Sequence, residues 1–259
     1  MKLPLRLLCP LLAGVAACAG STAPAAAFTP RVRVEIVSRA ITLMPPALQR
    51  QLRRHPRELN EAALAGGAAE GQGEHALLPG TADAALQAAI ADATRLIDAR
   101  APMKDVARAF GRIAHAAADL SFALNIGPPD PRAARVYASF SRYTEQMLPK
   151  MALTFGLYAD PDLARGDVAA FARRTAADAR RDYDAILRSY FPRDREPNAQ
   201  DFDERSIAFA AASLEVSLAM TTTAKAWMFA WYRAHGDMTG TPTLEVPPPP
   251  TASPQEEQP

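Results

Sequence analysis

The sequence predicts an all-α protein with a single folded domain, and three observations lead to that fold class. Apolar residues recur at helical spacing along most of the chain, and no segment shows the two-residue alternation of a strand. Residues 104–130 are apolar around most of a helical circumference, which is typical of a buried helix. Residues 203–235 are apolar on all sides and have few charges. We therefore expect a helical bundle of roughly 210 ordered residues built around these two segments.

The first 27 residues have the composition of an export signal. Lys2 and Arg6 provide a positive start, and residues 7–19 form an apolar run that is too short to span a bilayer. No other stretch is apolar enough to be read from the sequence as a membrane span. We expect an exported protein of the periplasm or cell envelope.

Two processing sites compete within this signal. Residues 25–27 form an Ala-Ala-Ala signal-peptidase site, and cleavage there would leave Phe28 as the first residue. The sequence before Cys18 resembles a lipobox, and cleavage there would remove residues 1–17 and leave Cys18 lipidated. The first site predicts a soluble exported protein, and the second predicts a lipoprotein.

Charge and cysteine content exclude some function classes. Both cysteines, Cys9 and Cys18, lie in the signal, so the folded part has no disulfide and no thiol ligand. Removal of residues 1–27 would leave 27 basic against 28 acidic residues. A nearly neutral chain argues against electrostatic binding of nucleic acid, whereas phospholipid or a membrane surface stays open as a partner. The sequence does not predict an oligomeric state.

Prolines and glycines divide the rest of the chain into helices. Pro30 begins a first helix that should end near Met44, before a Pro-Pro pair. A second helix follows from residue 47 to about 54 and continues towards residue 64. A glycine-rich loop over residues 66–80 then contains His75.

The later helices are bounded in the same way. Thr81 caps a helix over residues 82–99, and the central helix of residues 104–130 ends at a Gly-Pro-Pro sequence. A helix from Pro131 should kink or break at Pro149. We expect two more helices, over residues 168–190 and 203–235, followed by a disordered proline-rich tail at residues 241–259.

His115 and Asp119 are the polar residues that stand out in the central helix. They are four residues apart, so they lie on the same helical face. Moving either group from water into the apolar interior without a hydrogen-bond partner costs on the order of several kcal/mol. A hydrogen bond between the two or a neighbouring arginine would satisfy both, and so would a bound metal ion.

This central segment resembles the zinc-dependent phospholipase C and S1/P1 nuclease superfamily, whose central helix has a His-x-x-x-Asp motif. Residues 113–120 match the first half of the motif, but Asn125 stands where the family has a further histidine. Residues 36–45 resemble the family's first helix, with Arg33 in place of a histidine. Glu145 keeps the acid of a later His-x-x-x-Glu motif without its histidine.

The resemblance implies an all-helical domain over residues 28–240 and a zinc site that this chain completes only in part. His115, Asp119, Glu145 and His75 are the candidate metal ligands, and no catalytic residue is assigned. Because a cation repels a metal ion, Arg33 disfavours zinc at its position. We expect the Arg33 guanidinium to reach Asp119 or Glu145 instead and to form a buried ion pair there.

Three functions follow from these observations. The first is an exported phospholipase C/P1 nuclease-like protein with an incomplete metal site and doubtful catalysis. The second is an active zinc-dependent phosphodiesterase with a reduced metal site, which would use zinc to polarise the phosphoryl group and lower the pKa of a bound water. The third is a non-catalytic helical envelope lipoprotein, in which His115 and Asp119 have a structural role.

Overall fold

Proline at the first helical position begins five of the α-helices that the structure describes. These helices are α1 (Pro30–Thr42), α2 (Pro46–Arg54), α3 (Pro56–Ala65), α7 (Pro131–Met147) and α8 (Pro161–Ala164). Proline has no backbone N–H, and its φ angle already suits a helix, so it loses nothing at a position where that N–H would have no helical partner. The side chains of Thr29, Asp130 and Asp160 accept backbone N–H groups as N-caps of α1, α7 and α8.

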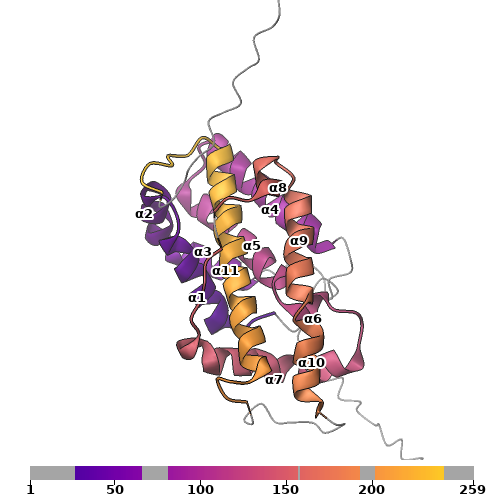
Figure 1. Cartoon of the computed structure of the whole chain (residues 1–259). Helices are drawn as coiled ribbons and strands as arrows, with labels where there is room; N and C mark the ends of the chain where they lie inside the picture. Colours follow the sequence, from indigo (N-terminus) through magenta and orange to yellow (C-terminus); the bar gives the residue numbers. More distant parts are fainter. Residues whose placement is uncertain (1–26, 66–80, 157, 193–201, 242–259) are drawn as a thin grey trace, which may run out of the picture.

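The computed structural model describes residues 27–65, 81–156, 158–192 and 202–241, and these residues form an all-α bundle with no strand among them (Figure 1). The remaining helices are α4 (Thr81–Asp98), α5 (Met103–Leu120), α6 (Ala123–Ile126), α9 (Val168–Arg180), α10 (Tyr183–Tyr190), α11 (Ile207–Arg233) and the short 3₁₀ helix η1 (Leu148–Lys150). The predicted fold class is confirmed. All of the predicted export signal except Ala27, including Cys18, lies outside the described residues, as do His75 and nearly all of the proline-rich tail.

Helix α11 runs the length of the bundle, with α1 to α3 on one side and α9 and α10 on the other (Figure 1). It packs closely against α5 and α1. Trp227 of α11 is fully buried, and its indole N–H donates to the Phe110 carbonyl oxygen of α5 at 2.8 Å. The two organising helices expected from the sequence therefore lie in contact.

The predicted central helix is interrupted at a place where no break was expected from the sequence. Helix α5 ends at Leu120, and Phe122 adopts an extended conformation before α6 begins. The Phe122 ring is fully buried between Phe28 and Phe140, with ring centroids 4.9 Å and 5.8 Å away. A continuous helix would keep the backbone donors of this turn within the helix, but here Glu215 of α11 accepts the Ala123 N–H at 2.9 Å. Tertiary contacts thus override the helical propensity of this stretch.

The predicted helix over residues 168–190 is also divided, into α9 and α10. The break at Arg181 and Asp182 precedes Tyr183, whose ring packs directly on Gly127 and whose hydroxyl donates to the Pro128 carbonyl oxygen at 3.0 Å. A Cβ atom at Gly127 would lie 1.9 Å from this ring, so only glycine allows the approach. The turn that ends the central segment is therefore held by α10.

The expectation that no segment after the signal is apolar enough for a membrane span is wrong: within the part of the chain that the structure describes, α11 alone is long and apolar enough to cross a membrane. In its most apolar window, 61% of the residues are buried inside the bundle, as expected for a core helix. Ile207, Leu214 and Tyr232 are exposed, so the helix is not enclosed on every side.

Candidate functional site

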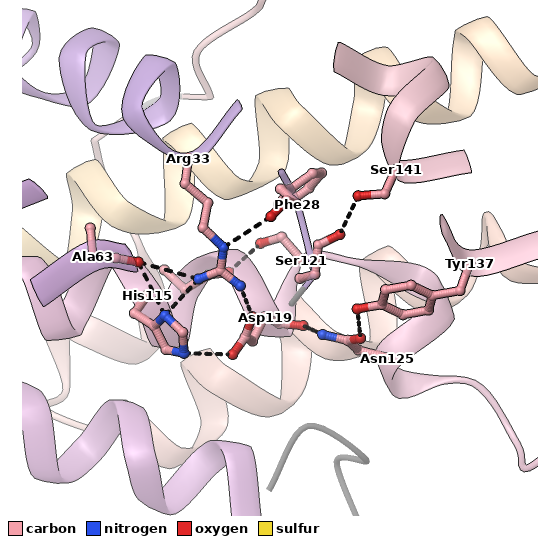
Figure 2. A network of polar contacts seen from close by, with 11 residues as sticks. Phe28, Arg33, Ala63, His115, Asp119, Ser121, Asn125, Tyr137 and Ser141 are labelled. Carbon is pink, nitrogen blue, oxygen red and sulfur yellow. Dashed lines mark hydrogen bonds and ion pairs between the residues drawn. The ribbon is translucent and has the colours of Figure 1, made fainter. Parts of the chain in front are cut away.

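Helix α5 places His115 and Asp119 side by side near the centre of the bundle (Figure 2). Nε2 of His115 lies 3.0 Å from Oδ2 of Asp119, and both side chains are about nine-tenths buried. The four-residue spacing brings the two groups into contact through one helical turn, as the sequence predicts. This contact is the first of the alternatives that the sequence left open.

Arg33 of α1 reaches the same two residues, which confirms the predicted ion pair. Its Nη2 atom lies 2.5 Å from Oδ1 of Asp119, and its Nη1 atom lies 2.6 Å from Nδ1 of His115 (Figure 2). The guanidinium also donates to the carbonyl oxygens of Phe28 at 3.3 Å and Ala63 at 3.4 Å. The side chain is only 3% exposed, so a buried positive charge is held by one carboxylate, one imidazole and two backbone carbonyls.

Nδ1 of His115 lies 2.6 Å from Nη1 of Arg33 and 3.1 Å from the Ala63 carbonyl oxygen. A guanidinium can only donate hydrogen bonds, so the shorter of these two contacts makes Nδ1 of His115 the acceptor of a bond from Nη1 of Arg33. The ring proton then lies on Nε2, which donates to Oδ2 of Asp119. Both carboxylate oxygens and both ring nitrogens are thus engaged in a closed set of contacts among Arg33, His115 and Asp119, which we call the arginine triad.

This arrangement is a buried ion pair, and its guanidinium disfavours a metal ion at the same place. A zinc ion here would have to replace Arg33 at Nδ1 of His115 or share the Asp119 carboxylate with it, and it would be repelled by the guanidinium. Among the described residues, no three His, Cys, Asp or Glu side chains gather where they could hold a metal ion, so Glu145 does not join His115 and Asp119 in such a group. Glu145 is half-buried on α7, and His75 lies outside the described residues, so a metal role for either stays a prediction.

Asn125 and Tyr137 extend the polar network away from the arginine triad. Asn125 occupies the position where the resembled family has a histidine, and its Nδ2 atom donates to the Asp119 carbonyl oxygen at 3.4 Å. The Tyr137 hydroxyl donates to Oδ1 of Asn125 at 2.7 Å (Figure 2). Burial raises the pKa of Tyr137 above its usual range, and the Asp119 charge raises it further, so the phenol remains a donor.

Phe28 joins the same region from the start of the described chain. Its ring packs edge-on against Phe122, and its carbonyl oxygen accepts from Nε of Arg33. The preceding Ala27 is fully buried, and its carbonyl oxygen accepts from Oγ of Ser141 at 3.4 Å. The residues around the predicted signal-peptidase site are therefore packed into the bundle next to the arginine triad.

Glu215 is a second buried acid, and it lies within the apolar helix α11. Its side chain is fully buried on α11, and Oε1 accepts the Ala123 N–H. Oε2 has no hydrogen-bond partner among the described residues. Burial raises the pKa of Glu215 well above its ordinary value, and Asp182 adds to that shift, so the environment favours the neutral carboxylic acid over the carboxylate.

Comparison with known proteins leaves the arginine triad as the main guide to function. No family model, no curated protein and no solved structure matches this chain.

Proposed function

We propose that this chain is an exported helical protein of the phospholipase C/P1 nuclease type in which an arginine stands in place of a metal centre, and that it acts in the cell envelope without hydrolysing phosphodiesters. The observation that carries the proposal is the contact of the Arg33 guanidinium with both His115 and Asp119. These are the residues of the motif that the resemblance assigns to zinc.

The electrostatic reason is that a buried carboxylate needs a cation. Zinc is one such cation, and a guanidinium is another, which binds carboxylate and imidazole acceptors through a fixed set of N–H donors. Asp119 and His115 are retained in this chain, whereas the position of the missing histidine holds Arg33. The replacement keeps the buried charges balanced and removes the Lewis acid on which phosphodiester hydrolysis in such enzymes depends.

The location in the envelope rests on the sequence of residues 1–27. Cleavage after Ala27 would release the protein, and lipidation of Cys18 would tether it to a membrane. In either form, the folded domain would serve as a binding or structural protein.

The test uses the native exported protein, purified without an affinity tag. Zinc and other transition metals are quantified by mass spectrometry, and hydrolysis of phosphatidylcholine and of bis(4-nitrophenyl) phosphate is measured with and without added zinc. We expect substoichiometric metal and hydrolysis no faster than that of His115→Ala. Stoichiometric zinc together with hydrolysis that His115→Ala abolishes would overturn the proposal in favour of an active metal-dependent phosphodiesterase.

A further inference from the structure

An extended segment crosses the outside of the bundle along α11. It comprises residues 151–156 and 158–160, and we call it the α11 strap. Met151 and Asp160, at its two ends, both have extended backbone angles. The strap joins the end of the bundle at α7 to α8 at the opposite end (Figure 1).

Two backbone amides of the strap donate to hydroxyl groups of α11. The Thr154 N–H lies 3.1 Å from Oγ of Ser217, and the Gly156 N–H lies 3.2 Å from Oγ1 of Thr221. Two residues of extended chain span about 6.6 Å, and four residues of helix rise about 6 Å. The strap and the helix therefore keep the same register over this distance.

The hydroxyls of Ser217 and Thr221 form a different kind of hydrogen bond from other helical hydroxyls in the bundle. The hydroxyls of Thr94, Ser121, Thr144 and Ser189 each donate to the carbonyl oxygen four residues earlier in their own helix. Ser217 and Thr221 instead accept from another segment. Their spacing places both on one stripe of α11, under the strap.

The strap is held most firmly at its Asp160 end. Asp160 is almost fully buried and pairs with Lys225 of α11 at 3.2 Å and with Arg174 of α9 at 2.6 Å. Just before the other end, Lys150 pairs with Glu204. Between these ion pairs, the described strap residues make two neutral hydrogen bonds to α11, and the Tyr158 hydroxyl, next to the Asp160 end, donates to the Leu43 carbonyl oxygen at 2.7 Å.

The side chains of the strap alternate between two environments. Met151, Leu153 and Phe155 are half-buried against the apolar core, and Ala152, Thr154 and Gly156 are exposed. The strap is thus a single layer of extended chain, with one row of side chains facing the bundle and the other facing solvent. Segments with little burial and exposed hydrogen bonds open more easily than the core of a protein.

We propose that the α11 strap is a latch, which opens and recloses on α11 while the rest of the bundle stays folded. The paired ends act as hinges, and the Thr154 and Gly156 hydrogen bonds are the clasp. Opening uncovers the stripe with Ser217 and Thr221, which continues from the exposed Leu214. The protein would then present a longer apolar and hydroxyl-bearing face of α11 to solvent. This inference does not depend on the proposed function.

Hydrogen exchange of the wild-type chain tests the latch directly. Exchange of the amides in residues 151–156 and in α11 is followed by mass spectrometry at increasing urea concentration. We expect the strap amides to exchange at least about tenfold faster than those of α11, with a rate that depends little on urea, as for a local opening. Strap amides that exchange at the α11 rate and with the same urea dependence would overturn the proposal, because opening would then require global unfolding.

The double variant Ser217→Ala with Thr221→Val removes both hydroxyl acceptors and keeps the side-chain shapes similar. We expect it to accelerate exchange of the strap amides further and to leave exchange in α5 unchanged. The matched control is Ser189→Ala, which removes a hydroxyl that bonds within α10 and should leave the strap unaffected. Unchanged strap exchange in the double variant would show that the two hydrogen bonds are not the clasp, and so would also contradict the proposal.

Discussion

Nη2 of Arg33 lies 2.5 Å from Oδ1 of Asp119, although 86 residues separate the two along the chain. The contact ties α1 to α5 through two charges that are both nearly fully buried. A buried pair of this kind contributes little net stability when intact, because each charge must lose its water. Removal of one of the two charged side chains is costly, because the other charge is then left unpaired in the apolar interior.

Arg33→Ala should therefore lower the free energy of unfolding by about 3–5 kcal/mol, since it leaves Asp119 buried without its cation. Urea unfolding followed by circular dichroism measures the loss. Arg31→Ala, at an exposed position of the same helix, serves as the control. A loss for Arg33→Ala no larger than that for Arg31→Ala would show that Asp119 finds another partner.

Metal ions and chelators should leave the melting temperature of the wild-type protein unchanged. A ligand stabilises a protein only if it binds the folded state, and the arginine triad already contains its own cation. Thermal unfolding is compared after dialysis against EDTA and after addition of zinc. Destabilisation by several degrees with EDTA would contradict this prediction and indicate a structural metal.

Glu215→Gln should abolish a pH dependence of stability between mildly acidic and mildly basic pH. Because burial raises the folded-state pKa of Glu215, the stability linked to this group is fully present below the unfolded-state pKa, near 4.5. It is lost as the pH rises from there through the raised pKa of the folded state. Glutamine keeps the acceptor for the Ala123 N–H but cannot ionise.

The free energy of unfolding of wild type and Glu215→Gln is measured at a series of pH values. We expect the wild type to lose stability relative to the variant as the pH rises. Glu61→Gln, which changes an exposed acid paired with Arg57, should keep the wild-type dependence. Parallel curves for wild type and Glu215→Gln would contradict a raised pKa of Glu215 in the folded state.

Acid should destabilise the protein through Asp160. Burial alone would raise the pKa of this carboxyl, but hydrogen bonds and charges from Arg174 and Lys225 outweigh burial and lower it. The stability linked to Asp160 is therefore present above its unfolded-state pKa, near 3.8, and is lost as the pH falls through the lowered folded-state pKa. Arg174→Ala should move the acid unfolding midpoint to higher pH, whereas Arg173→Ala, at the exposed neighbouring position, should not.

The mature protein should lack residues 1–27 or residues 1–17. Intact mass spectrometry of the protein from its native envelope distinguishes the two, because only cleavage before Cys18 leaves acyl chains on the new N-terminus. A mass that includes Met1 would contradict export through either site.

The helices themselves could be predicted from the sequence because their limits depend on local chemistry. The ends of α1, α2 and α4 lie within a few residues of the predicted ones, and a helix break occurs at the expected Pro149. The interruption at Phe122 could not be predicted, since it depends on aromatic rings and an acid from distant helices. Nothing in the local pattern of residues 104–130 reports on those partners.

The candidate site likewise has some contacts that could be predicted from the sequence and some that could not. The pairing of His115 with Asp119 follows from their spacing, and the contact with Arg33 follows from charge balance in a buried place. The Tyr137–Asn125 contact was missed, because a tyrosine on an apolar helical face gives no sign that its hydroxyl has a polar partner. Glu215 did carry a signal, as a lone acid in an apolar stretch, but its partner is a backbone N–H that sequence does not mark.

The position of α11 has a consequence for how the chain acquires its structure. The bond from Trp227 to Phe110 closes a loop of 117 residues, and that from Glu215 to Ala123 closes one of 92 residues. Helix α11 thus packs on helices from parts of the chain that are synthesised long before it. Those helices cannot bury their apolar faces until α11 has been synthesised and has packed against them. Mean sequence separation between contacts slows folding, so this bundle should fold more slowly than a bundle of sequential neighbours. A chain interrupted before residue 207 would keep its apolar interior open and would be prone to aggregate.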